Sequence, residues 1–168
     1  MAAVTSYGSR IMDGLLNTVP AVLAGAGEGG GVDRVWTETL ETGAADSTSS
    51  LYVIARLPSN ARLLGASELA HDALGATTAT FDIGVYNIGS RSDFTDDPDA
   101  INAGVVCSTA GDKKFISGRE LWGQQVWEFI NGVTVDPGVD VDIKLVLNDA
   151  HLSSGGGTVT ASIHYAVD

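Results

Sequence analysis

Hydrophobic and polar residues alternate along the last segment of the chain. Apolar side chains occupy every second position from Val159 to Val167, and mostly polar ones lie between them. Successive side chains of a β-strand point to opposite faces, so this pattern predicts a strand with one buried face. Residues 139–147 repeat the alternation, and the Ser/Gly-rich residues 153–157 separate the two segments. The sequence therefore predicts a C-terminal antiparallel hairpin.

Shorter apolar runs predict several further strands, which are separated by segments typical of turns. Asp97 followed by Pro98 is typical of a helix start, so one or two helical turns are expected over residues 97–103. A short turn is expected over residues 118–122. The expected strands span residues 32–41, 51–57, 61–70, 78–86 and 113–116, and the turns span residues 42–50, 58–60 and 136–138.

Seven or eight short strands predict an all-β fold, a two-layer antiparallel sandwich of the jelly-roll-like kind. The sequence does not order the strands, and an immunoglobulin-like Greek key fits the same pattern. The Cys and Trp framework of antibody domains is absent. The 21 glycines against four prolines agree with many tight turns.

The first 31 residues differ from the rest and are predicted to form an extended or short-helical N-terminal arm that ends in the Gly-rich linker 25–31. Residues 32–168 form the expected sandwich domain, here called the body. In the arm an apolar residue recurs every four positions, and two more lie alongside, as on one helix face: Tyr7, Ile11, Leu15 and Val19, with Met12 and Leu16. This face either packs on its own domain or docks on a neighbouring subunit or partner, so these six residues are the candidate partner contacts.

Charge and cysteine content narrow the function classes. The 168 residues carry 21 acidic and 9 basic side chains, a formal net charge of −12. Such a chain repels phosphates and anionic lipids, so we expect neither nucleic acid nor a membrane as a partner. The single cysteine, Cys107, excludes an internal disulfide and follows two valines, so it is expected to be buried. Neither a membrane span nor a signal peptide is expected.

No set of residues predicts catalysis, and we expect no enzyme activity and no cofactor. The densest carboxylate group comprises Asp93, Asp96, Asp97 and Asp99, which fits either a solvated acidic loop with a helix cap or a cation site. Three histidines lack metal-type spacing and are expected at the surface or in partner contacts: His71, His151 and His164. Three tryptophans either close one end of the core or form an aromatic patch for sugar or protein contact: Trp36, Trp122 and Trp127.

Several stretches of the body resemble a family of small structural proteins of tailed bacteriophages, the capsid decoration or cement proteins. The resemblance rests on residues 51–64, 69–75 and 80–86, the Gly-Arg-Glu-Leu-Trp stretch at 118–122, residues 136–143, and residues 157–165. It covers most of the body, from about residue 33 onward, and not the arm. It implies a β-sandwich on the outer surface of the head, made in the host cytoplasm, with the major capsid protein and copies of itself, for instance as a trimer, as partners.

The expected function is therefore a virion structural protein that binds the outer surface of the capsid shell and stabilises it. A head–tail junction or tail-associated virion protein is one alternative. A carbohydrate-binding jelly-roll module that uses the tryptophans is another.

Overall fold

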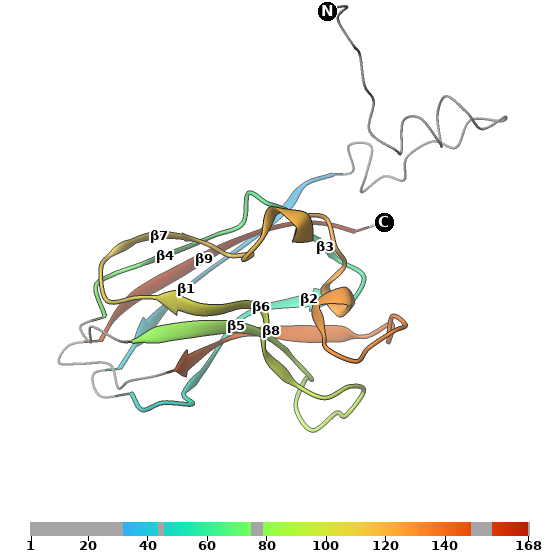
Figure 1. Cartoon of the computed structure of the whole chain (residues 1–168), viewed down its shortest axis with the longest axis horizontal. Helices are drawn as coiled ribbons and strands as arrows, with labels where there is room; N and C mark the ends of the chain where they lie inside the picture. Colours follow the sequence, from blue (N-terminus) through green and yellow to red (C-terminus); the bar gives the residue numbers. More distant parts are fainter. Residues whose placement is uncertain (1–31, 44–45, 75–78, 149–155, 168) are drawn as a thin grey trace, which may run out of the picture.

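The computed structural model describes residues 32–43, 46–74, 79–148 and 156–167, and within them the regular structure consists mainly of strands, joined by loops (Figure 1). Two short 3₁₀ turns are also present, η2 (Arg119–Leu121) and η3 (Val126–Phe129). The strands of the described part are β1 (Arg34–Thr42), β2 (Leu51–Pro58), β3 (Arg62–Leu63), β4 (Glu68–His71), β5 (Thr80–Tyr86), β6 (Asp97–Val106), β7 (Gly111–Lys114), β8 (Asp140–Asn148) and β9 (Gly157–Ala166).

These strands form two antiparallel sheets that face each other. One sheet has the order β1-β9-β4-β7, with β3 also paired to β9, and the other has the order β2-β8-β5-β6. If the two-residue β3 is set aside, the first strand pairs with the last, the second with the seventh, the third with the sixth, and the fourth with the fifth. This nested pairing is that of a long hairpin rolled into two layers, which is a jelly roll. The expected all-β sandwich is confirmed, and its strand order selects the jelly roll over the immunoglobulin-like Greek key.

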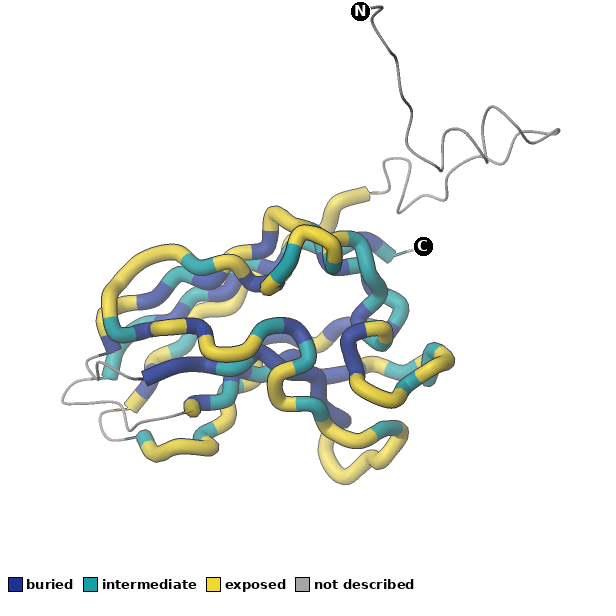
Figure 2. Tube along the Cα trace, in the orientation of Figure 1, coloured by how far each residue is buried: buried dark blue, intermediate teal, exposed yellow. Residues whose placement is uncertain are grey.

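The core lies between the inner faces of the two sheets. On β9 the alternation read from the sequence matches the burial from Val159 to Ile163, where Val159, Ala161 and Ile163 are buried and the residues between them are half-buried. It is wrong at the end of the strand, where Tyr165 is half-buried and Ala166 is buried. The central strands β5 and β8 are buried over most of their length (Figure 2). Phe81 of β5 meets Tyr52 of β2 edge to face, with ring centroids 6.0 Å apart. Burial of these inner faces is the main stabilising contribution to the sandwich.

The predicted C-terminal hairpin is wrong, although both of its strands exist. β8 pairs with β2 and β5 in one sheet, whereas β9 pairs with β1, β3 and β4 in the other. Each of the two strands has a partner from the first half of the chain, so the connection between them crosses from one sheet to the other. The alternation predicts which side chains are buried but does not identify the partner strand.

The helix expected over residues 97–103 is also wrong, because these residues belong to strand β6. Ile101 and Val105 of this segment are buried in the core, so pairing with β5 overrides the local Asp-Pro signal. Pro98 is tolerated because β6 is an edge strand with two shifts of register against β5. Irregular pairing and a proline at an edge also discourage the addition of further strands.

The single strand expected over residues 61–70 is divided in two. β3 and β4 both pair with β9, and residues 64–67 bend away between them. In the gap the Ser67 hydroxyl donates to the His164 carbonyl at 3.1 Å and accepts from its N–H at 2.9 Å. The Ser67 hydroxyl thus replaces a backbone acceptor for the His164 N–H where the ladder is interrupted, while the His164 carbonyl also accepts from the Leu64 N–H at 2.9 Å. The expected turns after β2 and over residues 118–122 are present, the first closed by a bond from Ala61 N to Pro58 O.

Candidate functional site

The six arm residues expected to contact a partner lie outside the described residues, and so does His151. They are Tyr7, Ile11, Met12, Leu15, Leu16 and Val19. Candidate sites are therefore built from the body alone. Within the described part, no helix is long and apolar enough to cross a membrane.

A cleft of about 290 Å³ opens between strands β1 and β2. Each of these strands is the edge of its sheet, so the cleft lies along one open side of the sandwich. Trp36 of β1 is 37% exposed and Val53 of β2 is 52% exposed. The complete lining consists of Trp36, Glu38, Val53, Ile54, Ala55, Arg56 and Asp142. Edge strands with exposed apolar side chains are natural templates for contact with another chain.

An ion pair lies beside these apolar residues. The Arg56 Nε donates to Asp142 Oδ1 at 2.8 Å, and the Asp142 side chain is only 6% exposed. The hydrogen bond to this carboxylate raises the pKa of the Arg56 guanidinium. Arg56 and Asp142 neutralise each other. Glu38 is the other charged residue that lines the cleft.

The sequence contained a signal for this cleft that the strand predictions did not use. Val35 and Trp36 are consecutive, so β1 carries large apolar side chains on both of its faces. On β2, the pairing with β8 shifts between Val53 and Ala55, and Ile54 and Ala55 are both buried. This bulge interrupts the alternation at Ile54 and Ala55 and leaves Val53 on the exposed face, as Leu51 is.

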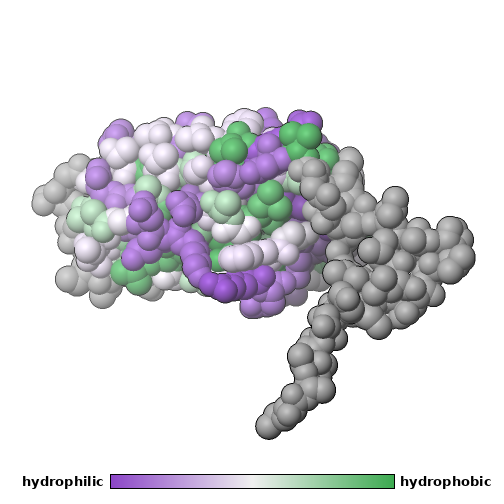
Figure 3. Space-filling model, turned by 90° about the horizontal axis from the view of Figure 1, so that it is seen from above, coloured by the Kyte–Doolittle hydropathy of each residue, from purple (hydrophilic) through white to green (hydrophobic). Residues whose placement is uncertain are grey.

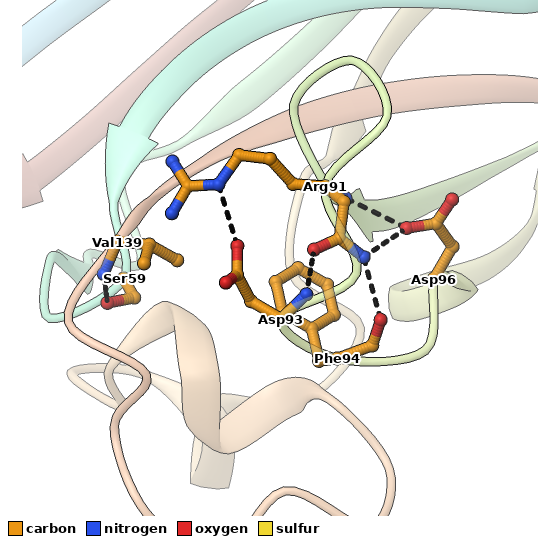
Figure 4. Close-up of polar contacts among 7 residues, drawn as sticks. Ser59, Arg91, Asp93, Phe94, Asp96 and Val139 are labelled. Atoms are coloured by element: carbon orange, nitrogen blue, oxygen red, sulfur yellow. Dashed lines mark hydrogen bonds and ion pairs between the residues drawn. The ribbon is translucent and has the colours of Figure 1, made fainter.

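The loop after β5 has a defined internal structure (Figure 4). The buried Asn87 donates through Nδ2 to the Phe94 carbonyl at 2.7 Å and to Asp96 Oδ1 at 2.9 Å. Its Oδ1 accepts from the Asp93 N–H at 3.0 Å. Arg91 Nε in turn donates to Asp93 Oδ2 at 2.8 Å. The loop is therefore held from within by one amide side chain.

The acidic residues of this region accept hydrogen bonds from other parts of the fold. Asp96 and Asp93 hold the loop, and Asp97 Oδ2 accepts from the backbone N–H of Asn131 at 2.8 Å. A side-chain hydrogen bond with Asp97 raises the pKa of Asp99, helped by partial burial and by the Asp97 charge. The described residues contain no group of three or more His, Cys, Asp or Glu side chains placed to hold a metal ion. The helix cap expected here is wrong, because the segment is a strand.

The tryptophans do not close the end of the core. Trp36 and Trp122 are exposed, the latter at 42%, and Trp127 is half-buried with its Nε1 donating to Gln125 Oε1 at 2.7 Å. Trp122 packs closely against Gly65, where an added Cβ would come within 2.3 Å of the indole ring. The Arg119 guanidinium lies 5.6 Å from the Trp122 ring centre. The exposure leaves the aromatic-patch interpretation open for Trp36 and Trp122, which lie on different elements.

The remaining candidates are divided between core and surface. Cys107 is buried as expected, donates to the Ala79 carbonyl at 3.0 Å, and has a pKa raised to about 11 by burial.

His71 is buried at the end of β4, contrary to the expected surface position, because it shares the inner face of the strand with Leu69. Its Nδ1 lies 2.7 Å from the Asp72 carbonyl oxygen. His164 is on the outer side of β9, with Nδ1 2.9 Å from Asp33 Oδ2.

The outer face of the five-stranded sheet is largely polar. Figure 3 views the molecule from this side and shows hydrophilic residues across it, with separate hydrophobic groups rather than one continuous patch. On β1 and β9, Thr39 and Thr160 share a hydrogen bond of 3.0 Å, and the Thr158 hydroxyl donates to Glu41 at 2.7 Å. The apolar edge at β1 and β2 is therefore the more distinctive candidate interaction surface.

The strand order and the sandwich can be compared with solved structures. A chain in the capsid of Ralstonia phage GP4 superposes with a TM-score of 0.58 at 15% identity, over 81% of this chain and 83% of that chain. A chain in the capsid asymmetric unit of cyanophage Pam1 superposes with a TM-score of 0.55 at 19% identity, over 90% and 97% of the two chains. The fold is similar to that of two phage capsid chains. No family model matches the sequence, and no curated protein is significantly similar to it.

Proposed function

We propose that this chain is a virion structural protein of a tailed phage that decorates the outer surface of the capsid and stabilises the shell. The observation that carries the proposal is the similarity in fold, over 81% and 90% of this chain, to chains of similar length in two phage capsid structures. The jelly roll, the apolar edge at β1 and β2, and the arm that leads into β1 supply surfaces for adhesion rather than chemistry. Neither enzyme activity nor a cofactor is part of the proposal.

Adhesion would come from many weak contacts. The body would lie on the major capsid protein, and arm residues such as Ile11 and Leu15 would reach a neighbouring subunit or another copy of this chain, for instance within a trimer. Repetition of a weak contact over a shell raises its overall strength through multivalency. The net charge of −12 would keep exposed copies soluble and discourage contact between particles.

The test compares purified phage heads with and without the protein. We expect heads that lack it to lose DNA at a lower temperature and to recover their stability when the purified chain is added back. Deletion of residues 1–30 should reduce occupancy on the head while the body still folds, as checked by circular dichroism. Heads with unchanged heat resistance would overturn the stabilising role.

The number of copies per particle distinguishes a decoration protein from the main alternative. A head–tail junction or tail-associated protein would be present in few copies at one vertex, whereas a decoration protein covers the shell. Quantitative mass spectrometry of whole particles, with the major capsid protein as the internal standard, distinguishes the two locations.

A further inference from the structure

Exposed apolar side chains are concentrated at one side of the body. Of the eight large hydrophobic residues exposed in the described part, five lie on β1, on β2 or just before β1. They are Val32, Val35, Trp36, Leu51 and Val53. Both strands are unpaired on their outer side, and the cleft between them is lined by Trp36 and Val53. An edge of this kind attracts an apolar segment unless something covers it.

The arm has the chemistry to cover this edge. Its residues 7–19 carry six of the apolar side chains described above and only two charges, Arg10 and Asp13. Of the formal net charge of −12, residues 1–31 carry −1, from Arg10 against Asp13 and Glu28, so the body carries −11. A formally neutral segment is not repelled by the acidic body. Arg10 also provides a cation for Glu38, the charged residue of the cleft outside the Arg56–Asp142 pair.

The tether favours the arm of the same chain over that of a second copy. Residues 20–31 connect the apolar segment to Val32, and a Gly-rich stretch of that length has a root-mean-square span of about 19 Å. Trp36 lies four residues beyond Val32, or roughly 13 Å along an extended strand. A linker whose length matches the distance to be spanned gives an effective concentration in the millimolar range. A second copy at micromolar concentration cannot compete with it.

We propose that in the free protein residues 7–19 fold back and occupy the cleft between β1 and β2 of their own chain. The cleft is at the small end of the range for binding pockets, so it holds a few aliphatic side chains rather than a drug-sized ligand. Docking would cover Trp36 and Val53 and keep the apolar face of the arm out of solvent. This goes beyond the proposed function and does not depend on it, because it concerns the isolated chain.

Cross-linking of the full-length protein tests the contact. Cys107 is buried, so two introduced cysteines are the reactive thiols. Leu15→Cys is combined with Val53→Cys and treated with a short bis-maleimide at micromolar concentration. The matched control combines Leu15→Cys with Val106→Cys, since Val106 is 49% exposed against 52% for Val53 but lies on β6, at the opposite edge of the sheet. We expect an internally linked monomer at several-fold higher yield in the first pair.

Three outcomes overturn the proposal: equal yields in the two pairs, no linked monomer with Val53→Cys, or covalent dimers in its place. Dimers would assign the cleft to the arm of a second copy. Absence of any link would assign the cleft to a different occupant, such as the capsid surface.

Hydrogen exchange gives a second measurement that does not alter the body. In the full chain, Leu15→Asp should speed exchange several-fold in β1 and β2 and leave the central strand β5 unchanged. Unaltered exchange in β1 and β2 would overturn the proposal even if the protein still binds phage heads. The two proposals can therefore fail separately.

Discussion

Gly84 of β5 lies so close to Pro98 of β6 that a Cβ on the glycine would be 2.5 Å from the proline carbonyl carbon. The same Cβ would be 2.4 Å from the carbonyl oxygen of Asp97. Both neighbours are backbone atoms, which cannot move aside as a flexible side chain can. The irregular edge strand β6 therefore depends on a glycine in the strand beside it.

Gly84→Ala should lower the free energy of unfolding by about 3 kcal/mol, the upper end for atoms added to a packed interior. Urea denaturation followed by circular dichroism measures this change. Gly89→Ala is the control, because Gly89 has a φ of +63° but open space around it, and the strain of that conformation costs only about 1 kcal/mol. Equal losses in the two variants would contradict the close approach of β5 and β6.

Phe81→Ala should destabilise the sandwich by about 3–5 kcal/mol, because Phe81 is fully buried and its removal leaves a cavity under the Tyr52 ring. Phe94→Ala serves as the comparison, since Phe94 is only partly buried against the core. Its loss should cost about 1 kcal/mol, in proportion to the smaller area removed from water. Thermal or chemical denaturation of both variants measures the difference. A loss of stability in Phe94→Ala as large as that in Phe81→Ala would contradict the central position of Phe81 in the core.

Asn87→Ala should loosen the loop between β5 and β6 and cost about 2–3 kcal/mol, since three side-chain hydrogen bonds of a buried amide are removed. The change should be local, so we expect faster proteolysis within residues 88–95. Asn131→Ala, at an exposed position, should have no effect on cleavage. If the loop of the Asn87 variant resists protease as well as the wild-type loop does, the internal bonding is not what holds it.

We expect the protein to lose stability in alkali because of the buried thiol of Cys107. Burial raises the pKa of this thiol from 9.0 to about 11, so the folded state holds the proton more tightly than the unfolded chain. The resulting stabilisation is complete below pH 9 and disappears as the pH rises through 11. A shift of about two units corresponds to about 2–3 kcal/mol. Wild-type protein should therefore lose about 2 kcal/mol more than Cys107→Ala between pH 8 and pH 11, measured by urea denaturation, and parallel curves would contradict the assignment.

The sequence predicted strands better than it predicted their partners. The alternation correctly identified the buried face of β9 from Val159 to Ile163, because side-chain direction is a local property of an extended chain, but it failed at Tyr165 and Ala166. One of the partners of β9 is β1, and Thr39 and Thr160, which share a hydrogen bond across this pair, are 121 residues apart. The sequence around either threonine does not identify the other as its partner. A hairpin with the neighbouring β8 was the simplest local interpretation, and long-range packing of both sheets overrode it.

Candidate sites were predicted less well than the fold. Asp97 and Pro98 are a typical helix start, but the segment forms strand β6 instead because it pairs with β5 and buries Ile101. The cleft was missed because it depends on a bulge at Val53 and on two strand edges that meet only in the folded sandwich. The burial of Cys107 was predicted correctly, because the two valines before it indicate an apolar segment. The partner role of the arm residues stays a prediction.

The pairing of β1 with β9 also determines when this protein can fold. Arg34 faces Tyr165 and Thr42 faces Gly157, so the ladder cannot form until the ribosome has released nearly the whole body. Until then β1 and its apolar edge residues have no ladder partner in the chain. Folds built on such distant pairings form slowly, in milliseconds to seconds, and expose unpaired strands while they wait. We therefore expect the newly made chain to be most vulnerable to aggregation just before β9, Gly157–Ala166, emerges, and a product that lacks β9 to need a chaperone.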